Sequence, residues 1–232
     1  EKVRQWYLEN MNVNDKKSLF NPGNGLVSNI CHDPRVSLHV LQDMLMPYVL
    51  TGQLTIKLNT VVSEIKREGR TLHSALIHNL IANKETRMTA CYFIDATEAG
   101  DVLPLAELDY VVGAEAKSDT NEPHALEVAD PQDIQAITHV LAMEYREHED
   151  HTIEEPEMYT FWRDFHPSIW PDKYLSFYAP HPITKEKREY TLFRQETGFP
   201  LWDYRRIFDC EQFNSWVYAG DLSLMNWPQS DY

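Results

Sequence analysis

Residues 89–101 change character along their length, from apolar at the start to small and acidic at the end. The first half is rich in β-favouring side chains, which predicts a buried strand over residues 90–94. In the second half, Ala96, Thr97, Ala99 and Gly100 keep the side chains short, and Asp101 follows them. Short side chains let a ligand approach the backbone, and Asp101 can cap a following helix. The pattern predicts a sheet edge that faces a ligand, with an ordinary strand-to-helix turn as the alternative.

Two arginines, Arg205 and Arg206, follow each other within the aromatic phrase Leu201-Trp-Asp-Tyr-Arg-Arg206. Guanidinium groups among aromatic rings suit recognition of a carboxylate or another planar anion. Asn226, in a proline-containing turn near the C-terminal end, could orient such a substrate by hydrogen bonds. In the alternative interpretation the rings are core residues, and the arginines pair with local acids such as Asp203 and Asp209.

The phrase Gly23-Asn-Gly25-Leu-Val-Ser28 is a degenerate match to the dinucleotide-binding fingerprint. That fingerprint works only where it follows a strand and opens a helix, so that free N–H groups meet the pyrophosphate. No convincing strand precedes it here, so a structural turn near a site is the better interpretation. Asn24 in this turn and Arg35 just beyond it are outer candidates for substrate contact.

His148 and His151 lie three residues apart, a spacing that can place two metal ligands on one helical face. The surrounding segment is strongly charged and is flanked by Glu154-Glu155-Pro156. A solvated acidic loop is therefore the favoured interpretation, and we predict no metal site.

The composition narrows the possible partners. The chain has 36 acidic and 21 basic residues, a net charge of −15, and no dense basic cluster, which argues against nucleic acid and anionic membranes. No apolar run approaches the roughly 20 residues of a membrane span. The three cysteines are far apart in sequence and indicate a reducing compartment, the cytoplasm.

Acids and aromatics together are also typical of carbohydrate clefts, so a carbohydrate-binding or carbohydrate-cleaving protein is an alternative, and a non-catalytic interaction fragment is a third.

A helix followed by strands must position these residues. Asp33 and Pro34 suit a helix start, and apolar residues at 3.6-residue spacing extend it toward Gly52. Strand-like runs follow at residues 54–58, 60–66 and 72–79, with a hairpin turn at Gly69. Residues 111–113 suggest another strand, and residues 131–146 fit a helix or a strand. The pattern is α/β, or α+β within this chain.

Taken in order, the motifs resemble a known family. They are Asn21-Pro-Gly-Asn-Gly25, Cys31-His-Asp-Pro-Arg35, Tyr92-Phe-Ile-Asp-Ala-Thr-Glu-Ala-Gly-Asp101, Gly113-Ala-Glu-Ala116, Asn121-Glu-Pro-His124, Trp202-Asp-Tyr-Arg-Arg206 and Asn226-Trp-Pro-Gln-Ser-Asp-Tyr232. The chain resembles bacterial FAD-dependent oxidoreductases with a glutathione-reductase-type flavin fold. The resemblance implies an incomplete FAD-binding domain over residues 1–110 and a β-rich, C-terminally truncated substrate-binding domain over residues 111–232, which favours a strand at 135–145.

The resemblance also implies which residues meet the cofactor. Ala96 and Thr97 match the Ala-Thr of a strand that closes over FAD, with Gly100 and Asp101 beside it, and Glu98 stands where related flavoproteins often have glycine. The pair Val61-Val62 matches a strand beside the adenine. The N-terminal Gly-rich βαβ unit has no counterpart, so we expect an interior fragment whose cofactor site is shared with the remainder of its own polypeptide.

The implied activity is transfer of a hydride or electrons between a small organic substrate and the flavin. The expected substrate contacts are Arg205, Arg206, Asn226, Arg35 and Asn24. The sequence indicates no catalytic base, and the isolated chain is expected to bind FAD weakly or not at all and to be inactive.

Overall fold

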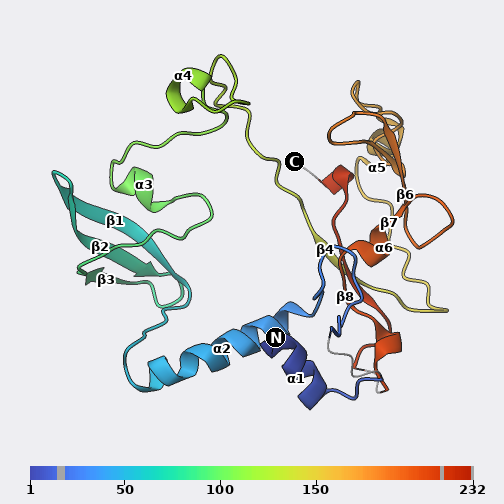
Figure 1. The fold of residues 1–232 in the computed structure, drawn as a ribbon, viewed down its shortest axis with the longest axis horizontal. Coiled ribbons are helices and arrows are strands. Elements are labelled where there is room, and N and C mark those ends of the chain that lie inside the picture. Colours follow the sequence, from blue (N-terminus) through green and yellow to red (C-terminus); the bar gives the residue numbers. More distant parts are fainter. Residues whose placement is uncertain (15–18, 215–216, 231–232) are drawn as a thin grey trace. The chain divides into compact units, whose positions relative to one another are not determined.

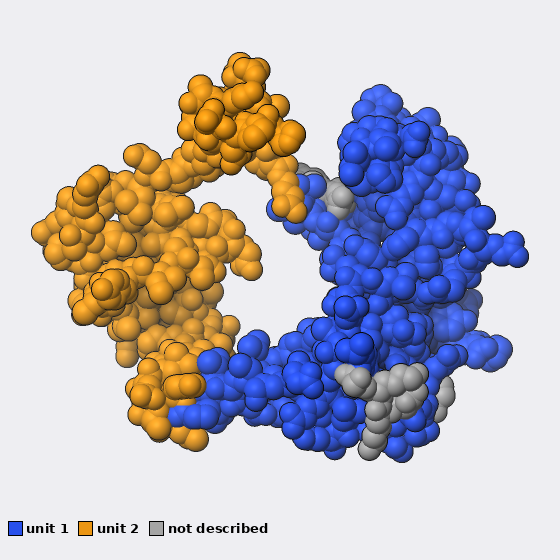
Figure 2. Space-filling view, in the orientation of Figure 1, with its two compact units in different colours: residues 1–47, 136–232 blue, residues 48–135 orange. Residues whose placement is uncertain are grey.

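The computed structural model describes residues 1–14, 19–214 and 217–230. The chain divides into two compact units (Figure 2). Unit 1 combines Glu1–Pro47 with Ala136–Tyr232, and unit 2 is Tyr48–Gln135. Unit 1 is thus assembled from both ends of the chain. The expected boundary at residue 110, between an FAD-binding and a substrate-binding domain, stays a prediction.

Unit 2 is built around an antiparallel sheet of three strands in the order β1-β2-β3 (Figure 1). The strands are β1 (Thr60–Glu68), β2 (Thr71–Asn79) and β3 (Lys84–Met88). Gly69, with φ +58°, forms the turn of the β1–β2 hairpin, where the left-handed conformation favours glycine. The predicted strands at 60–66 and 72–79 and the hairpin between them are confirmed.

Three other strands predicted in unit 2 are absent from its described residues: 54–58, 90–94 and 111–113. The pairing of β3 ends at Met88, and Tyr92 and Ile94 beyond it are 87% and 89% exposed. These side chains favour a strand, but no neighbouring strand is there to pair with them. Two short helices follow, α3 (Val102–Leu105) and α4 (Lys117–Thr120).

The predicted helix from Pro34 is confirmed as α2 (Pro34–Leu50). The Asp33 carboxylate accepts a hydrogen bond from the Arg35 N–H at 2.8 Å, which satisfies a backbone donor in the first turn. Apolar residues of α2 are largely exposed: Leu38, Leu41, Met44, Leu45, Met46, Tyr48, Val49 and Leu50. The preceding helix α1 (Lys2–Asn10) was not predicted, because the sequence of residues 1–32 is polar and its periodicity is weak.

Unit 1 contains two small sheets. One has the order β4-β9-β8, with β4 (Leu141–Glu144), β8 (Arg206–Phe208) and β9 (Leu222–Met225), all antiparallel. The other has the order β5-β6-β7, with β5 (Tyr178–Pro180), β6 (Lys187–Thr191) and β7 (Phe199–Pro200). Around them are α5 (Tyr159–Asp164), α6 (Leu201–Tyr204) and the 3₁₀ turns η1 (Cys210–Gln212) and η2 (Pro228–Ser230). β4 confirms a strand within 135–145.

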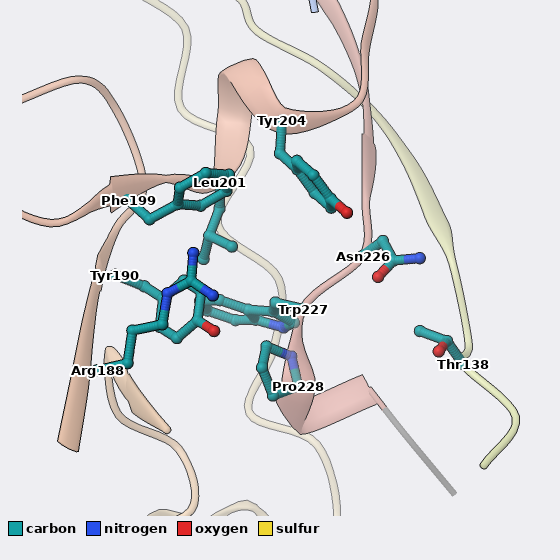
Figure 3. A pocket seen from close by; sticks show the side chains of 9 residues that line it. All are labelled: Thr138, Arg188, Tyr190, Phe199, Leu201, Tyr204, Asn226, Trp227 and Pro228. Carbon is teal, nitrogen blue, oxygen red and sulfur yellow. The ribbon is translucent and has the colours of Figure 1, made fainter. Parts of the chain in front are cut away.

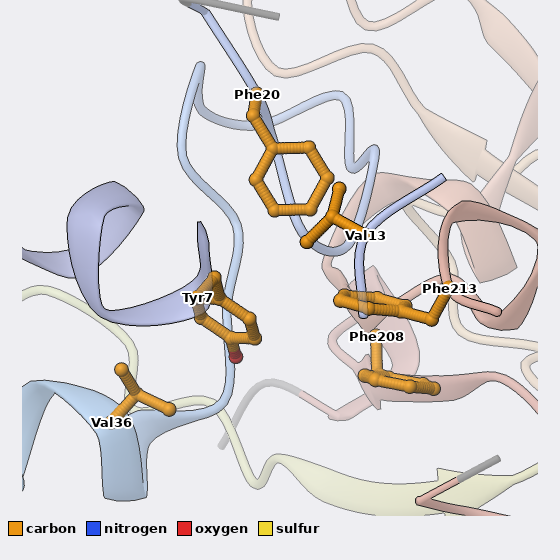
Figure 4. Packing of buried hydrophobic residues seen from close by; sticks show 6 residues of the cluster. All are labelled: Tyr7, Val13, Phe20, Val36, Phe208 and Phe213. Carbon is orange, nitrogen blue, oxygen red and sulfur yellow. The ribbon is translucent and has the colours of Figure 1, made fainter. Parts of the chain in front are cut away.

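Two hydrophobic clusters hold unit 1 together. The N-terminal cluster joins side chains from both ends of the chain (Figure 4): Tyr7, Val13, Phe20, Val36, Phe208 and Phe213. The second cluster joins β5, β6, α6 and β9 through Ala179, Tyr190, Leu201, Trp202 and Met225. Helices combined with small, mainly antiparallel sheets make the fold mixed, of the α+β kind. Within the described residues, no helix has the length and apolar character needed to cross a bilayer.

Candidate functional site

A cavity of about 360 Å³ lies in unit 1 beside the second cluster (Figure 3). It is lined by Thr138, Arg188, Tyr190, Phe199, Leu201, Tyr204, Asn226, Trp227 and Pro228. The Arg188 guanidinium, the Tyr204 hydroxyl and the Asn226 carboxamide lie around one open space. Aromatic and aliphatic side chains combined with a few polar groups are typical of small-molecule sites.

Strand pairing places these side chains. β6 and β7 run parallel, with Tyr190 opposite Phe199. Gly198 allows this approach: its φ is +81°, and a Cβ at this position would lie 2.7 Å from Thr191 Cγ2. α6 follows directly, and the Ser223 hydroxyl donates to the Trp202 carbonyl at 2.7 Å, tying α6 to β9. The residues that directly follow β9, Asn226 to Pro228, line the cavity.

Arg188 is held by the rings beside it. Its guanidinium carbon lies 5.1 Å from the centre of the Tyr190 ring and 5.0 Å from that of Phe199. Burial raises the pKa of the Tyr190 phenol, and the neighbouring positive charge of Arg188 opposes that shift. Among the described residues, no carboxylate forms an ion pair with Arg188, which leaves its charge available to a ligand.

Of the predicted substrate contacts, the structure places only Asn226 in this cavity. Arg205 stacks on the Tyr204 ring, with its guanidinium carbon 5.4 Å from the ring centre. Its Nε is buried and has no hydrogen-bond partner among the described residues. Arg205 therefore keeps an unsatisfied donor, but it does not line the cavity.

Arg206 is instead the centre of a buried ion-pair network, which corrects the expectation that it clamps a substrate. Its guanidinium lies 2.9 Å from Asp221, 3.1 Å from Asp209 and 3.9 Å from Asp203. Its Nε donates to the Gly23 carbonyl at 2.9 Å. Burial raises the pKa of Asp209, and Arg206 opposes that rise. The charge of Arg206 is thus balanced within the protein.

Asn24 belongs to the same network, because its amide donates to Asp209 at 3.3 Å. The glycines beside it serve close packing. A Cβ on Gly23 would lie 2.0 Å from the Arg206 carbonyl oxygen, and one on Gly25 would lie 2.6 Å from Cys31 Sγ. No strand precedes this turn among the described residues, and the turn packs on β8, as the structural-turn interpretation predicts.

Gly23→Ala tests this packing. The added methyl group meets backbone on β8, so we expect the free energy of unfolding to fall by about 1–3 kcal/mol in urea denaturation. Leu26→Ala, in the same loop but half exposed, should change it by less than about 1 kcal/mol. Wild-type stability in Gly23→Ala would refute the close contact between this turn and β8.

Arg35 lies at a second cavity of unit 1, of about 340 Å³. Its side chain is 72% exposed and pairs with Asp33 at 2.6 Å, and the Tyr218 hydroxyl donates to the same carboxylate. Burial, together with the Asp33 charge, raises the pKa of Tyr7 to about 12, so its phenol stays protonated at neutral pH. The charge of Arg35 is therefore already paired with that of Asp33, although Arg35 lines this cavity.

The predicted adenine contacts, Val61 and Val62, lie on β1 of unit 2. β1 is an edge strand in the described sheet, paired only with β2. An edge strand leaves backbone N–H and C=O groups on one side unpaired, and these could bond a planar ring. The position of this pair is therefore compatible with the predicted contact, which stays a prediction.

The segment that carries Ala96, Thr97, Gly100 and Asp101 is an exposed turn. Its organiser is Asp95, whose carboxylate accepts from the Thr97 N–H at 3.0 Å and from the Val102 N–H at 3.1 Å. Asp101 occupies the cap position before α3, but its side chain makes no capping bond, so the predicted cap is supplied by Asp95. Gly100 has φ +67°, which favours glycine.

These features of unit 2 fit contact with part of a bound FAD. Small side chains and an open strand edge give the cofactor access to the backbone. Among the described residues, no Gly-rich turn between a strand and a helix offers free N–H groups to the pyrophosphate. Contact of these residues with FAD stays a prediction.

A metal centre finds no support in the described part of the chain, which has no group of three or more His, Cys, Asp or Glu residues able to hold an ion. His148 and His151 are exposed, and His151 Nε2 lies 2.7 Å from Glu149. The solvated-loop interpretation fits this exposure.

Cys210 is predicted to be unreactive. Burial, followed by its interaction with Asp221, raises the pKa of this thiol to about 12, so little thiolate exists at neutral pH. Iodoacetamide at about pH 8 should therefore label the exposed Cys91 well before Cys210, as measured by peptide mass spectrometry. Labelling in urea is the control, because the unfolded chain should react at all its cysteines. Equal rates in the folded protein would contradict the burial of Cys210.

The family model described as FAD dependent oxidoreductase matches residues 3–232. Searches of curated proteins and of solved structures found no match. The match covers both units and nearly the whole chain, and it confirms the resemblance to FAD-dependent oxidoreductases. The chain belongs to the FAD-dependent oxidoreductase family.

Proposed function

We propose that the chain is part of an enzyme that transfers a hydride or electrons between a small organic substrate and FAD, and that the unit 1 cavity holds the substrate. The observation that carries this proposal is the family match over residues 3–232. The cavity supports the location, because it combines aromatic walls with the polar ends of Tyr204 and Asn226.

Within this proposal, the residues of the chain bind and orient the substrate, and bound FAD supplies the redox chemistry. The rings of Trp227 and Phe199 would contact a flat substrate on its faces. The Asn226 carboxamide can donate and accept hydrogen bonds and so fix the orientation of the substrate. None of the nine described lining residues is an acid or a histidine, so a carbohydrate-cleaving site, which needs paired carboxylates, gains no support here.

We assign part of the flavin contact to unit 2, through the open edge of β1 at Val61-Val62 and the turn over residues 96–101. We infer a glutathione-reductase-type arrangement in which the remainder of the polypeptide holds the pyrophosphate. The exposed apolar residues of α2 support this, because exposed apolar side chains often mark surfaces that another part of a protein covers.

Flavin content tests the proposal. The complete polypeptide should purify with FAD at a molar ratio near one, measured by absorbance after release of the cofactor. The 232-residue chain by itself should retain little or none, because its residues contact only part of the cofactor. A complete polypeptide without flavin would contradict the proposed function, and stoichiometric flavin in the short chain would contradict the shared site.

A further inference from the structure

We propose that the ligand of the unit 1 cavity is an organic carboxylate with a flat, apolar body, and that Arg188 binds its carboxylate group. This inference rests on the proposed substrate role of the cavity and names the class of substrate that it accepts.

Arg188 differs from most arginines of unit 1 in its lack of a carboxylate partner. Others pair at 2.6 to 2.9 Å with nearby acids: Arg35, Arg146, Arg163, Arg194 and Arg206. In a chain with net charge −15, acids are plentiful, yet no described acid forms an ion pair with Arg188 and none lines its cavity. The positive charge therefore faces a space that a ligand anion can fill.

The guanidinium of Arg188 is also pre-organised. The Tyr190 and Phe199 rings, at 5.1 and 5.0 Å, hold it in place through cation–π contacts. A planar guanidinium held in this way can present two parallel N–H groups to a carboxylate. Binding then immobilises few additional bonds, which favours affinity.

The rest of the cavity selects the body of the ligand. Trp227, Leu201 and Pro228 offer flat or apolar surfaces, and the neutral polar groups of Asn226, Thr138 and Tyr204 lie among them (Figure 3). A ligand amine would find no acid among the described lining residues. A volume of about 360 Å³ suits a small cyclic acid.

Fluorine NMR with 4-fluorobenzoate and its neutral analogue 4-fluorobenzamide tests the inference on the 232-residue chain. The wild-type chain should bind the benzoate more tightly than the amide. Arg188→Met should weaken benzoate binding about tenfold or more and leave the amide unchanged, because only the charge-assisted bonds are lost. Arg188→Lys keeps the charge but not the planar guanidinium, so its affinity for the benzoate should lie between those of the wild type and Arg188→Met.

Lys187→Met is the matched control. Its ammonium lies over the Tyr178 ring and pairs with Asp172, and it does not line the cavity, so both probes should bind as in wild type. Equal wild-type affinity for the two probes, or unchanged benzoate binding in Arg188→Met, would overturn the inference. The comparison of the two probes on the wild-type chain tests the inference even if a variant fails to fold. Flavin is not needed for this measurement, so a complete polypeptide without flavin would refute the proposed function and leave the anion site standing.

Discussion

Arg206→Met should lower the free energy of unfolding by about 3–5 kcal/mol, measured by urea denaturation. The arginine side chain is 15% exposed, and it forms ion pairs with Asp203, Asp209 and Asp221. Its removal leaves carboxylates buried close together without a cation, which costs more than the loss of an exposed pair. The turn at Gly23 also loses the donor that its carbonyl accepts from.

Arg194→Met is the control for Arg206→Met. Arg194 also pairs with Asp203, at 2.9 Å, but its side chain is 67% exposed. Solvent screens such a pair, so the expected loss is below about 1 kcal/mol. Similar losses in the two variants would contradict the structural role of Arg206.

The pH dependence of Arg206→Met sharpens the test. Without the cation, the already raised pKa of Asp209 should rise further. A folded-state pKa above the unfolded value means that the folded protein binds the proton more tightly, so acidification toward that pKa stabilises the variant. Its deficit against wild type should therefore be smaller at about pH 5 than at about pH 8. A deficit that grows on acidification would count against the assignment.

Phe208→Ala should lower the free energy of unfolding by about 3–5 kcal/mol. Phe208 is 1% exposed, and its ring stacks on Phe213 with centres 4.6 Å apart. The ring also meets Tyr218 edge to face at 4.9 Å, so its removal opens a cavity in the N-terminal cluster. Because this cluster joins the two ends of the chain, urea denaturation should show one cooperative loss of unit 1 structure at lower denaturant.

Phe161→Ala is the matched control for Phe208→Ala. The Phe161 side chain is 50% exposed, so its truncation should cost about 1 kcal/mol or less. Phe208→Leu, which fills most of the volume, should be milder than Phe208→Ala. A stability loss in Phe208→Ala no larger than in Phe161→Ala would contradict the packing shown in Figure 4.

Local sequence signals predicted the local parts of the fold. The capping residue and proline before α2 marked its start, and Gly69 between two β-favouring runs marked the β1–β2 hairpin. Residues 90–94 carry the same kind of signal, but they are exposed and unpaired, because strand formation depends on a partner that local sequence does not specify. The division into units also depends on contacts distant in sequence, such as Tyr7 with Phe213.

The candidate site shows the same limit. Asn226 was predicted from its phrase, but Arg188 was missed because its function depends on Phe199, which reaches it only through the β6–β7 pairing. The available signal was the spacing of Arg188 and Tyr190, which lie two residues apart and therefore share one face of a strand. For Arg206, the alternative of pairing with Asp203 and Asp209 was the correct one. Asp221, the residue before β9, is a third partner. The sequence alone could not show whether Arg206 is buried in ion pairs or free to bind a substrate anion.

The most direct test of the central claim is anaerobic titration of the complete polypeptide with candidate small organic substrates, followed through the absorbance of its bound flavin. The account predicts that a substrate bleaches the flavin. It also predicts that Asn226→Leu slows bleaching without loss of flavin, because this residue lines the substrate cavity and not the flavin contacts assigned to unit 2. Bleaching at the wild-type rate in Asn226→Leu would contradict the assignment of the cavity, and a complete polypeptide without bound flavin would contradict the account as a whole.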